Sequence, residues 1–173
     1  MKKARLNAFL AAIAAAVVVL DQLTKYLARE HLGHGLLTLI PGFLELELHM
    51  NNGASLGIFG GQRWLLVTVS AVMAIAVIAA MYGMKKFSTK ERVTLAFILG
   101  GAVGNLIDRA ASGLVTDMLY FPWISKIPLL PDFVCNVADI AIVFGVIAFL
   151  IFFLIEDKKR TAAEASEAED AAE

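Results

Sequence analysis

Three aspartates stand at one end of long apolar runs, and they are the residues best placed for chemistry. Asp21, Asp108 and Asp139 each lie 16 or 17 residues from the charged residue at the other end of their run, and those other ends are Arg5, Arg92 and Glu156. At 1.5 Å per residue each separation is about 24–26 Å of helix, compared with a hydrocarbon core about 30 Å thick. If the opposite ends share one membrane surface, the three carboxylates share one depth near the other surface. Carboxylates there usually face a bundle interior or a water-filled cavity, so the spacing predicts a polar site.

Paired carboxyl groups could hydrolyse a peptide bond at such a site. One carboxylate takes a proton from water while the other carboxyl donates a proton to the carbonyl oxygen. Two carboxyls a few ångströms apart share a proton, because both cannot ionise cheaply. Asp139 would lie at the start of a helix, where unpaired N–H groups favour an anion, so it is the expected ionised member. A metal is not expected, because His31, His34 and His49 do not form a helical metal-binding pair.

The same residues also allow a purely structural interpretation. Asp21 lies four residues before Lys25, which is ordinary spacing for a helical ion pair. Asn136 and Asp139 are three apart at the expected start of a helix, as in an N-cap with an acidic third residue. The segment Gly100–Gly104 has the small-residue spacing that allows close helix packing. Asn105 is a membrane amide one turn from Asp108, so the two side chains lie on the same face of the helix.

The apolar runs themselves predict an all-α membrane protein, a bundle of four transmembrane helices. The chain has 173 residues, 59% of them hydrophobic, and a mean hydropathy of +0.73. These values exceed those of typical soluble domains. The expected helices cover approximately 6–29, 64–84, 91–110 and 137–156. Residues 1–160 would form one membrane-embedded domain.

Composition also excludes several classes of function. A net charge of −1 without a basic stripe gives no basis for nucleic-acid binding. The single cysteine, Cys135, excludes an internal disulfide framework and a multi-cysteine metal site.

The basic residues predict how the bundle is oriented. Ten of the fifteen lie before the first span, between the second and third, or after the fourth, all on one side of an up-down-up-down bundle. The positive-inside rule makes that side cytoplasmic. Both termini are then expected on the cytoplasmic side of a bacterial inner membrane, with the active site near its outer face. The N-terminus resembles a signal peptide but lacks a small-residue cleavage site after Leu20, so we expect an uncleaved first helix.

The segments outside the spans differ in character. Residues 43–48 alternate apolar and polar side chains, which predicts a small extracytoplasmic β element in the first outer loop. Residues 119–131 mix aromatic residues with prolines and are expected to be an irregular interfacial segment. Residues 161–173 are rich in alanine and acidic residues and are expected to form a disordered, acidic cytoplasmic tail.

Five short motifs in order give the chain a family resemblance. It resembles the lipoprotein signal peptidases, also called signal peptidase II, from about residue 6 to 156. The motifs that carry the resemblance are Asp21–Lys25, Asn51–Ala54, Gly100–Arg109, Val115–Asp117 and Asn136–Asp139. A single motif would be weak, but their order and spacing together are specific.

The resemblance implies an intramembrane aspartyl endopeptidase without a cofactor. Such an enzyme removes the signal peptide of a prolipoprotein by cutting just before a cysteine that carries diacylglycerol. Its partners would be this lipid-modified substrate, membrane lipids and cyclic peptide inhibitors of the globomycin kind, and no nucleic acid. Asp117 and Asp139 match the catalytic aspartates. The positions implied for substrate binding are Asn51, Gly53, Asn105, Arg109 and Asn136. Those implied to support the site are Asp21, Lys25 and Asp108.

Two departures from the family pattern and two other functions stay open at this stage. Cys135 and Leu56 replace commoner aromatic residues, which affects the lining of the substrate pocket. A small transporter or proton-coupled channel would also use intramembrane aspartates, but its charges would be distributed along the depth of the bundle. A scaffold that uses polar residues only for packing would not need Asp117.

Overall fold

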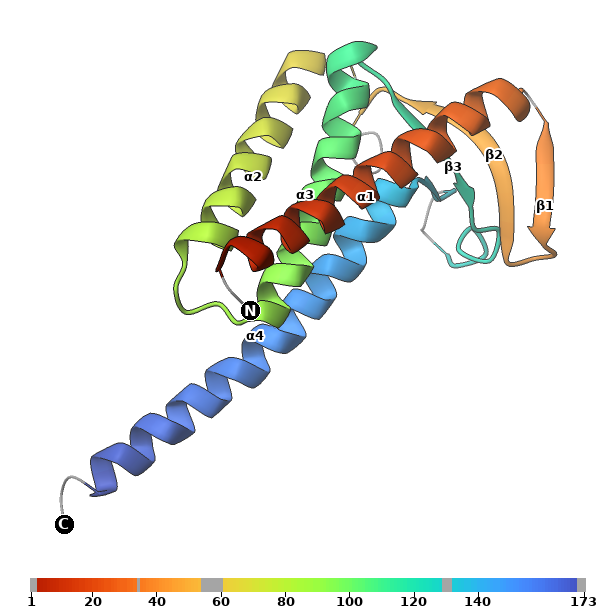
Figure 1. The fold of residues 1–173 in the computed structure, drawn as a ribbon. Helices are drawn as coiled ribbons and strands as arrows, with labels where there is room; N and C mark the ends of the chain where they lie inside the picture. Colours follow the sequence, from red (N-terminus) through yellow and green to blue (C-terminus); the bar gives the residue numbers. More distant parts are fainter. Residues whose placement is uncertain (1–2, 34, 54–60, 129–131, 171–173) are drawn as a thin grey trace.

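The computed structural model describes residues 3–33, 35–53, 61–128 and 132–170. Four helices in it are long and apolar enough to cross a membrane. They are α1 (Lys3–His31), α2 (Arg63–Gly83), α3 (Thr89–Ala111) and α4 (Val137–Asp170). The predicted bundle of four helices is therefore confirmed (Figure 1).

Helix α3 is the centre of the bundle, because it packs against each of the other three helices. Its glycines permit the close approach. A Cβ atom at Gly100 would lie 2.6 Å from the Cβ of Val17 in α1, and one at Gly101 would meet the backbone carbonyl of Ala138 in α4. No larger side chain fits at either position without moving a neighbouring helix. The small-residue packing expected of this segment is present.

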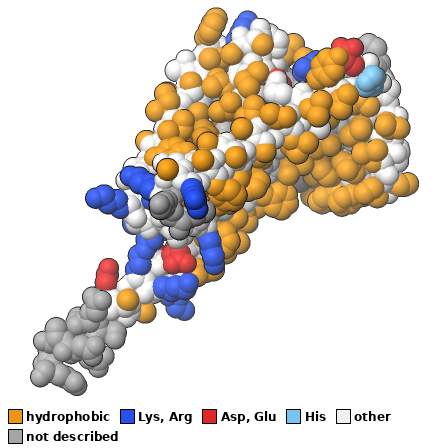
Figure 2. Space-filling model, in the orientation of Figure 1, with side chains coloured by type: hydrophobic (Ala, Val, Ile, Leu, Met, Phe, Trp, Pro, Cys, Tyr) orange, Lys and Arg blue, Asp and Glu red, His pale blue; other side chains and the backbone are white. Residues whose placement is uncertain are grey.

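Basic side chains gather at the end of the bundle where α1 begins and α2 connects to α3 (Figure 2). Ser88 and Glu91 form a reciprocal capping box at the start of α3. Arg160 of α4 lies 3.8 Å from the buried carboxylate of Glu91 and donates to the carbonyl of Lys86. Phe87 of this connection belongs to the apolar core that α1, α2 and α3 share. The basic end of the bundle is thus a packed structure in which α4 contacts the α2–α3 connection.

Helix α4 extends further than the sequence analysis predicted. The segment expected to be a disordered tail from residue 161 is helical through Asp170, and residues 171–173 lie outside the described part. Alanine and glutamate are among the strongest helix formers, and they dominate this segment. Growing an existing helix avoids the cost of nucleating a new one, which accounts for its continuation beyond the apolar span.

A four-stranded antiparallel sheet covers the other end of the bundle, in the order β1-β2-β3-β4 (Figure 1). The strands are β1 (Leu36–Ile40), β2 (Leu44–Asn51), β3 (Val115–Tyr120) and β4 (Val134–Cys135). Gly42, with φ of 71°, lies in the tight turn between β1 and β2. The β element predicted in the first outer loop is confirmed. The sheet also recruits β3 and β4, so the segment expected to be irregular from residue 119 begins as strand.

Large apolar side chains cover the outside of the helices, as Figure 2 shows over the visible face. Trp64 and Ile75 of α2 are 71% and 66% exposed, and Phe144 of α4 is 68% exposed. Such a surface suits a hydrocarbon solvent. The sheet at the end of the bundle carries two of the predicted site residues, Asn51 in β2 and Asp117 in β3.

Candidate active site

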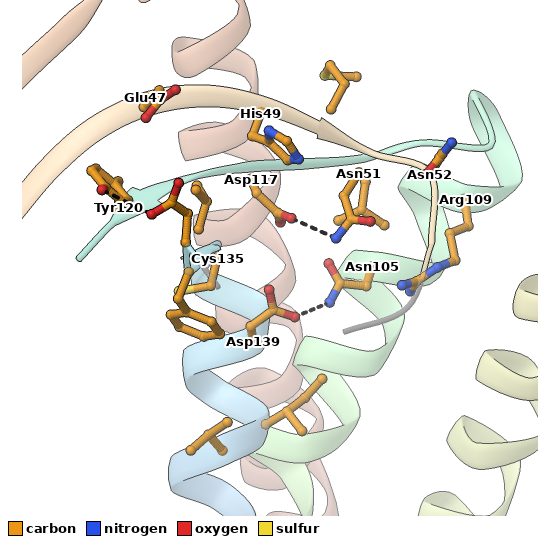
Figure 3. Close-up of a pocket in the computed structure, with 17 residues that line it drawn as sticks. Glu47, His49, Asn51, Asn52, Asn105, Arg109, Asp117, Tyr120, Cys135 and Asp139 are labelled. Carbon is orange, nitrogen blue, oxygen red and sulfur yellow. Dashed lines mark hydrogen bonds between the residues drawn. The ribbon is translucent and has the colours of Figure 1, made fainter. Parts of the chain in front are cut away.

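A cavity of about 750 Å³ opens at the end of the bundle that carries the sheet. Its walls come from α3, α4, β2, β3 and β4 (Figure 3). Four of the predicted site residues that line it are Asn51, Asn105, Asp117 and Asp139. The fold therefore brings together residues that are up to 88 positions apart in the sequence.

Asp117 enters this cavity from the middle of β3. Its side chain is only 2% exposed, and the strand is buried from Val115 to Met118. Asn51 donates a hydrogen bond from Nδ2 to Asp117 Oδ2 at 3.1 Å, and Asn136 Nδ2 donates to Asp117 Oδ1 at 2.6 Å. Both carboxylate oxygens are thus held by amides from other elements.

Asp139 enters from the first turn of α4. Asn105 of α3 donates from Nδ2 to its Oδ1 at 2.7 Å. The backbone N–H of Asn136 donates to Asp139 Oδ2 at 3.3 Å, while Asp139 N–H donates back to Asn136 Oδ1 at 2.9 Å. This reciprocal pair is the N-cap that the sequence spacing suggested. The structural interpretation of Asn136 as an N-cap is correct, and Asn136 also donates a hydrogen bond to Asp117.

The three asparagines share one orientation rule. The side-chain oxygen of each accepts a hydrogen bond from a group that can only donate, so its NH₂ group must point the other way. For Asn51 that donor is the N–H of Gly53 at 2.9 Å, and for Asn136 it is the N–H of Asp139. For Asn105 it is the ammonium group of Lys25, also at 2.9 Å. All three NH₂ groups therefore face the two aspartates.

A buried ion cluster lies beneath the aspartate pair. Lys25 Nζ is 2.8 Å from Asp21 Oδ2 and 3.1 Å from Asp108 Oδ2, with the lysine and Asp21 fully buried. Asp21 also accepts from Ala138 N–H at 2.9 Å, and Asp108 accepts from Thr116 N–H at 3.0 Å. The cluster thereby joins α1 and α3 to the residues directly before Asp139 and Asp117. The expected ion pair of Asp21 and Lys25 exists, and it supports the site.

Several members of this cluster were not predicted from the sequence. Gln22 donates to Asp21, Asp108 and the carbonyl of Gly104 at 3.1–3.2 Å. Arg29 donates to Thr116 Oγ1 at 2.8 Å. An amide directly beside Asp21 within a motif is the only sequence signal that could have indicated Gln22. Arg29 carries no such signal, because its partner lies 87 positions away.

Arg109 and Gly53 meet at one side of the cavity. Arg109 Nη2 donates to the carbonyl of Gly53 at 3.3 Å. Within the described part of the chain, Arg109 Nε is buried without a hydrogen-bond partner. A buried guanidinium N–H of this kind is available to a ligand. Leu56, singled out in the sequence, lies outside the described residues.

The opposite rim of the cavity is polar and was missed by the sequence analysis. It contains Glu47, His49, Tyr120 and Asp132. His49 pairs directly with Asp117 across β2 and β3, which only the strand register decides. The sequence showed β2 as an alternating strand but gave no sign of which strand would pair with it.

Burial and charge set the proton affinity of the groups outside the helices. Burial, and then the negative charge of Asp139, raise the pKa of Asp117 to about 6, although the hydrogen bonds from Asn51 and Asn136 lower it. Burial, followed by the charges of Asp139 and Asp117, raises the pKa of the Cys135 thiol to about 12. Cys135 is therefore a neutral thiol at physiological pH and unsuited to nucleophilic attack. Among the described residues, no three His, Cys, Asp or Glu side chains are grouped to hold a metal ion.

The comparisons with known proteins decide the family. Residues 13–155 match the family described as signal peptidase (SPase) II. This chain belongs to the signal peptidase II family. It is 40% identical over 148 residues to the lipoprotein signal peptidase of Brevibacillus brevis, which covers 85% of this chain and 95% of the relative. It is 38% identical over 154 residues to the lipoprotein signal peptidase of Symbiobacterium thermophilum, covering 87% and 97% of the two chains.

Solved structures agree with this assignment. A bacterial membrane enzyme determined by the in meso method at 2.3 Å resolution superposes with a TM-score of 0.78 at 28% identity, covering 88% of this chain and 91% of that one. A second, at 1.9 Å resolution, gives a TM-score of 0.73 at 29% identity, covering 85% and 93%. The signal peptidase II fold and a peptidase activity of the aspartic class are therefore established for this chain.

The pKa of Asp117 gives a test of which group supplies the proton. If protonated Asp117 is the acid, kcat/KM falls as pH rises through its pKa, because the acid form disappears. Asn51→Ala removes a hydrogen bond that stabilises the charged form. The pKa of Asp117 then rises, and the alkaline limb of the pH profile moves up by about one pH unit. The measurement is kcat/KM against pH on a purified precursor.

Asn52→Ala is the matched control for this experiment. Asn52 lines the same cavity, but its side chain donates to neither aspartate in the described structure. Its substitution should leave the position of the limb unchanged even if the rate changes. An unmoved limb in the Asn51 variant would show that Asp117 is not the titrating acid.

Proposed function

We propose that this signal peptidase II hydrolyses the signal peptide of diacylglyceryl-modified prolipoproteins with Asp117 and Asp139 as a metal-free catalytic pair. The observation that carries the proposal is the single asparagine that bridges the two carboxyl groups. Asn136 donates its side-chain N–H to Asp117 and its backbone N–H to Asp139. Carboxylates from a strand and a helix thereby face one cavity. The named relatives are lipoprotein signal peptidases, which gives the substrate class.

The chemistry follows from the hydrogen bonds around the two carboxyl groups. Asp139 acts as the base and takes a proton from water, whose oxygen attacks the carbon of the scissile carbonyl. Asp117 donates its proton to the carbonyl oxygen as the tetrahedral intermediate forms. When that intermediate collapses, the C–N bond breaks, the new amine takes the proton from Asp139, and Asp117 recovers its own. A pKa of about 6 for Asp117 keeps part of its population protonated near neutral pH.

The asparagines and Arg109 have different tasks in this proposal. Asn51, Asn105 and Asn136 fix the rotamers of the two carboxyl groups, so that little reorganisation is needed when charge moves. Arg109 and Gly53 hold the extended substrate backbone. The support for this role is the buried Nε of Arg109, which has no partner in the described structure. Asp21, Lys25 and Asp108 hold the supporting elements together.

The orientation in the membrane follows from the charges. The basic end of the bundle carries the start of α1 and the α2–α3 connection, whereas the cavity lies at the other end. By the positive-inside rule the cavity faces the outer surface of the bacterial inner membrane, and the N-terminus lies in the cytoplasm. A prolipoprotein presents its lipid-modified cysteine at that surface. The site then meets the bond to be cut where lipid ends and water begins.

A transporter function is disfavoured because an apolar core separates the two ends of the bundle that carry buried polar groups. The buried Glu91 lies at the basic end of α3, and the aspartate pair lies at the other end. Between them α1 and α3 form a core of Leu10, Ala14, Leu95 and Leu99. A transport pathway needs polar groups along its depth. A pure scaffold is disfavoured because a cavity of about 750 Å³ would serve no purpose in packing.

The first test of this proposal removes each carboxyl group separately. We expect Asp117→Asn and Asp139→Asn each to reduce kcat by about 10²–10⁴, since each removes one partner of the proton transfer. Asp132→Asn is a matched control, because Asp132 lines the same cavity but does not bond to the bridging asparagine. Cleavage of a lipidated precursor by purified protein is the measurement. Near-normal cleavage by either catalytic variant would remove that residue from the pair.

The second test concerns lipid and metal. Cleavage should require diacylglycerol on the cysteine, because each buried CH₂ group contributes about 0.8 kcal/mol to holding the substrate at the membrane surface. It should survive EDTA and be blocked by a cyclic peptide of the globomycin kind. Equal cleavage of an unlipidated precursor would contradict the proposed substrate. Activity lost in EDTA and restored by zinc would contradict the aspartate mechanism.

The third test concerns orientation. Cysteines introduced at Ser88 and Ser125 should be labelled from opposite sides of the membrane, with Ser125 outside. Native Cys135 is buried, and its thiol stays neutral because its pKa is about 12, so it should react slowly with the probe. Labelling of the Ser88 position from outside would reverse the proposed orientation.

A further inference from the structure

Lys25 is fully buried and touches neither aspartate of the catalytic pair, yet it bonds to a residue that does. Its ammonium group donates to Asn105 Oδ1 at 2.9 Å, and Asn105 Nδ2 donates to Asp139 Oδ1 at 2.7 Å. The lysine and the catalytic carboxylate are thus connected through one amide. This relay adds to the ion cluster that Lys25 forms with Asp21 and Asp108.

An amide side chain by itself has two orientations that differ by exchange of its O and N atoms. Only one of them presents a donor to Asp139. In the reverse orientation, the NH₂ group would face the lysine ammonium, and a carbonyl oxygen would face a carboxylate oxygen. Both contacts would be repulsive in a buried site, where electrostatic interactions are stronger than in water. Since an ammonium group can only donate, Lys25 forces the orientation that suits Asp139.

We propose, on the basis of the proposed function, that Lys25 is a positioning residue that acts through Asn105 to hold Asp139 ready as the catalytic base. The ion pairs with Asp21 and Asp108 keep the Lys25 ammonium group in place. Asp21 lies one helical turn before Lys25 on α1, and Asp108 lies one turn after Asn105 on α3. The cluster therefore fixes both the position of the lysine and the helix that carries the amide.

A second, longer hydrogen bond to Asn105 Oδ1 favours the same orientation of the amide. It comes from Asn136 Nδ2 at 3.2 Å, which also donates to Asp117 at 2.6 Å. The N–H of Asp139 fixes the orientation of Asn136 in turn. The bond from Lys25 is shorter, at 2.9 Å, and its donor carries a full charge. Lys25 is therefore the stronger of the two donors that orient Asn105.

A double-mutant cycle tests whether Lys25 acts through Asn105. The variants are Lys25→Gln, Asn105→Ala and the combination. For each we would measure kcat and KM on the lipidated precursor, with kcat calculated per folded protein molecule. We expect Lys25→Gln to lower kcat about a hundredfold, as loss of one preorganised donor does, with KM within about threefold. In the Asn105→Ala background, the same substitution should change kcat less than about threefold. Equal losses in both backgrounds would mean that Lys25 acts independently of Asn105, and the proposal would be wrong.

Lys25→Gln also leaves two buried carboxylates without their counter-charge, and such a variant can fail to fold. The pair Asp108→Asn and Asp108→Asn/Lys25→Gln therefore repeats the comparison, because its second member has the net charge of the wild-type cluster. The double variant should again lose kcat relative to Asp108→Asn, and only while Asn105 is present. Retained kcat in the double variant would overturn the proposal.

The control for the underlying function is Asp139→Asn in the same assay. If that variant cleaves normally, Asp139 is not the base, and both the proposed catalytic pair and the positioning role of Lys25 are wrong. If Asp139→Asn is inactive and the cycle is additive, the proposed function stands and the positioning role of Lys25 does not.

Discussion

The buried ammonium group of Lys25, shared between two carboxylates, is the interaction on which the rest of the site depends. Transferring one lysine and two aspartates from water into an apolar bundle is costly unless the charges are paired and their remaining hydrogen bonds are made. Both conditions hold here, since Asp21 and Asp108 also accept N–H groups from Ala138 and Thr116. Those two backbone groups belong to the residues directly before Asp139 and Asp117. The cost of burying the charges is offset by hydrogen bonds that also locate the strand and the helix that carry Asp117 and Asp139.

Close packing is the condition that allows this cluster to form. A Cβ atom at Gly104 would lie only 2.5 Å from Asp21 Oδ2, so a larger residue would displace the carboxylate from the lysine. Gly100 and Gly101 likewise have no room for a side chain, because α1 and α4 pack directly against them. Small residues are the usual means of helix association in lipid, where no hydrophobic driving force acts between apolar helices. In this protein they serve both packing and the charged cluster, because Gly104 lies directly against the Asp21 carboxylate.

Hydrogen bonds connect this cluster and the start of α4 to the two aspartates through asparagine side chains. Lys25 orients Asn105, and the first N–H groups of α4 orient Asn136. Both amides donate to the carboxyl groups of Asp139 and Asp117. Asn136 illustrates why structural and functional interpretations of one residue are compatible. It caps α4, and through the same side chain it holds Asp117. The groups that end regular structure are the ones with free hydrogen-bonding capacity, so sites form where helices begin.

The amino-acid sequence was enough to predict the four helices, their approximate ends apart from the C-terminal end of α4, and the family motifs. Long uncharged runs leave few alternatives in lipid, where backbone groups must be satisfied within a helix, and the equal spacing of Asp21, Asp108 and Asp139 from charged residues set their common depth. It did not determine the pairing of β2 with β3, because an alternating pattern specifies the faces of a strand and not its neighbour. Nor did it show Gln22 and Arg29 in the cluster, or His49 opposite Asp117. Those contacts join residues far apart in the chain, and only the packing of α1, α3 and the sheet decides which distant donor reaches which acceptor.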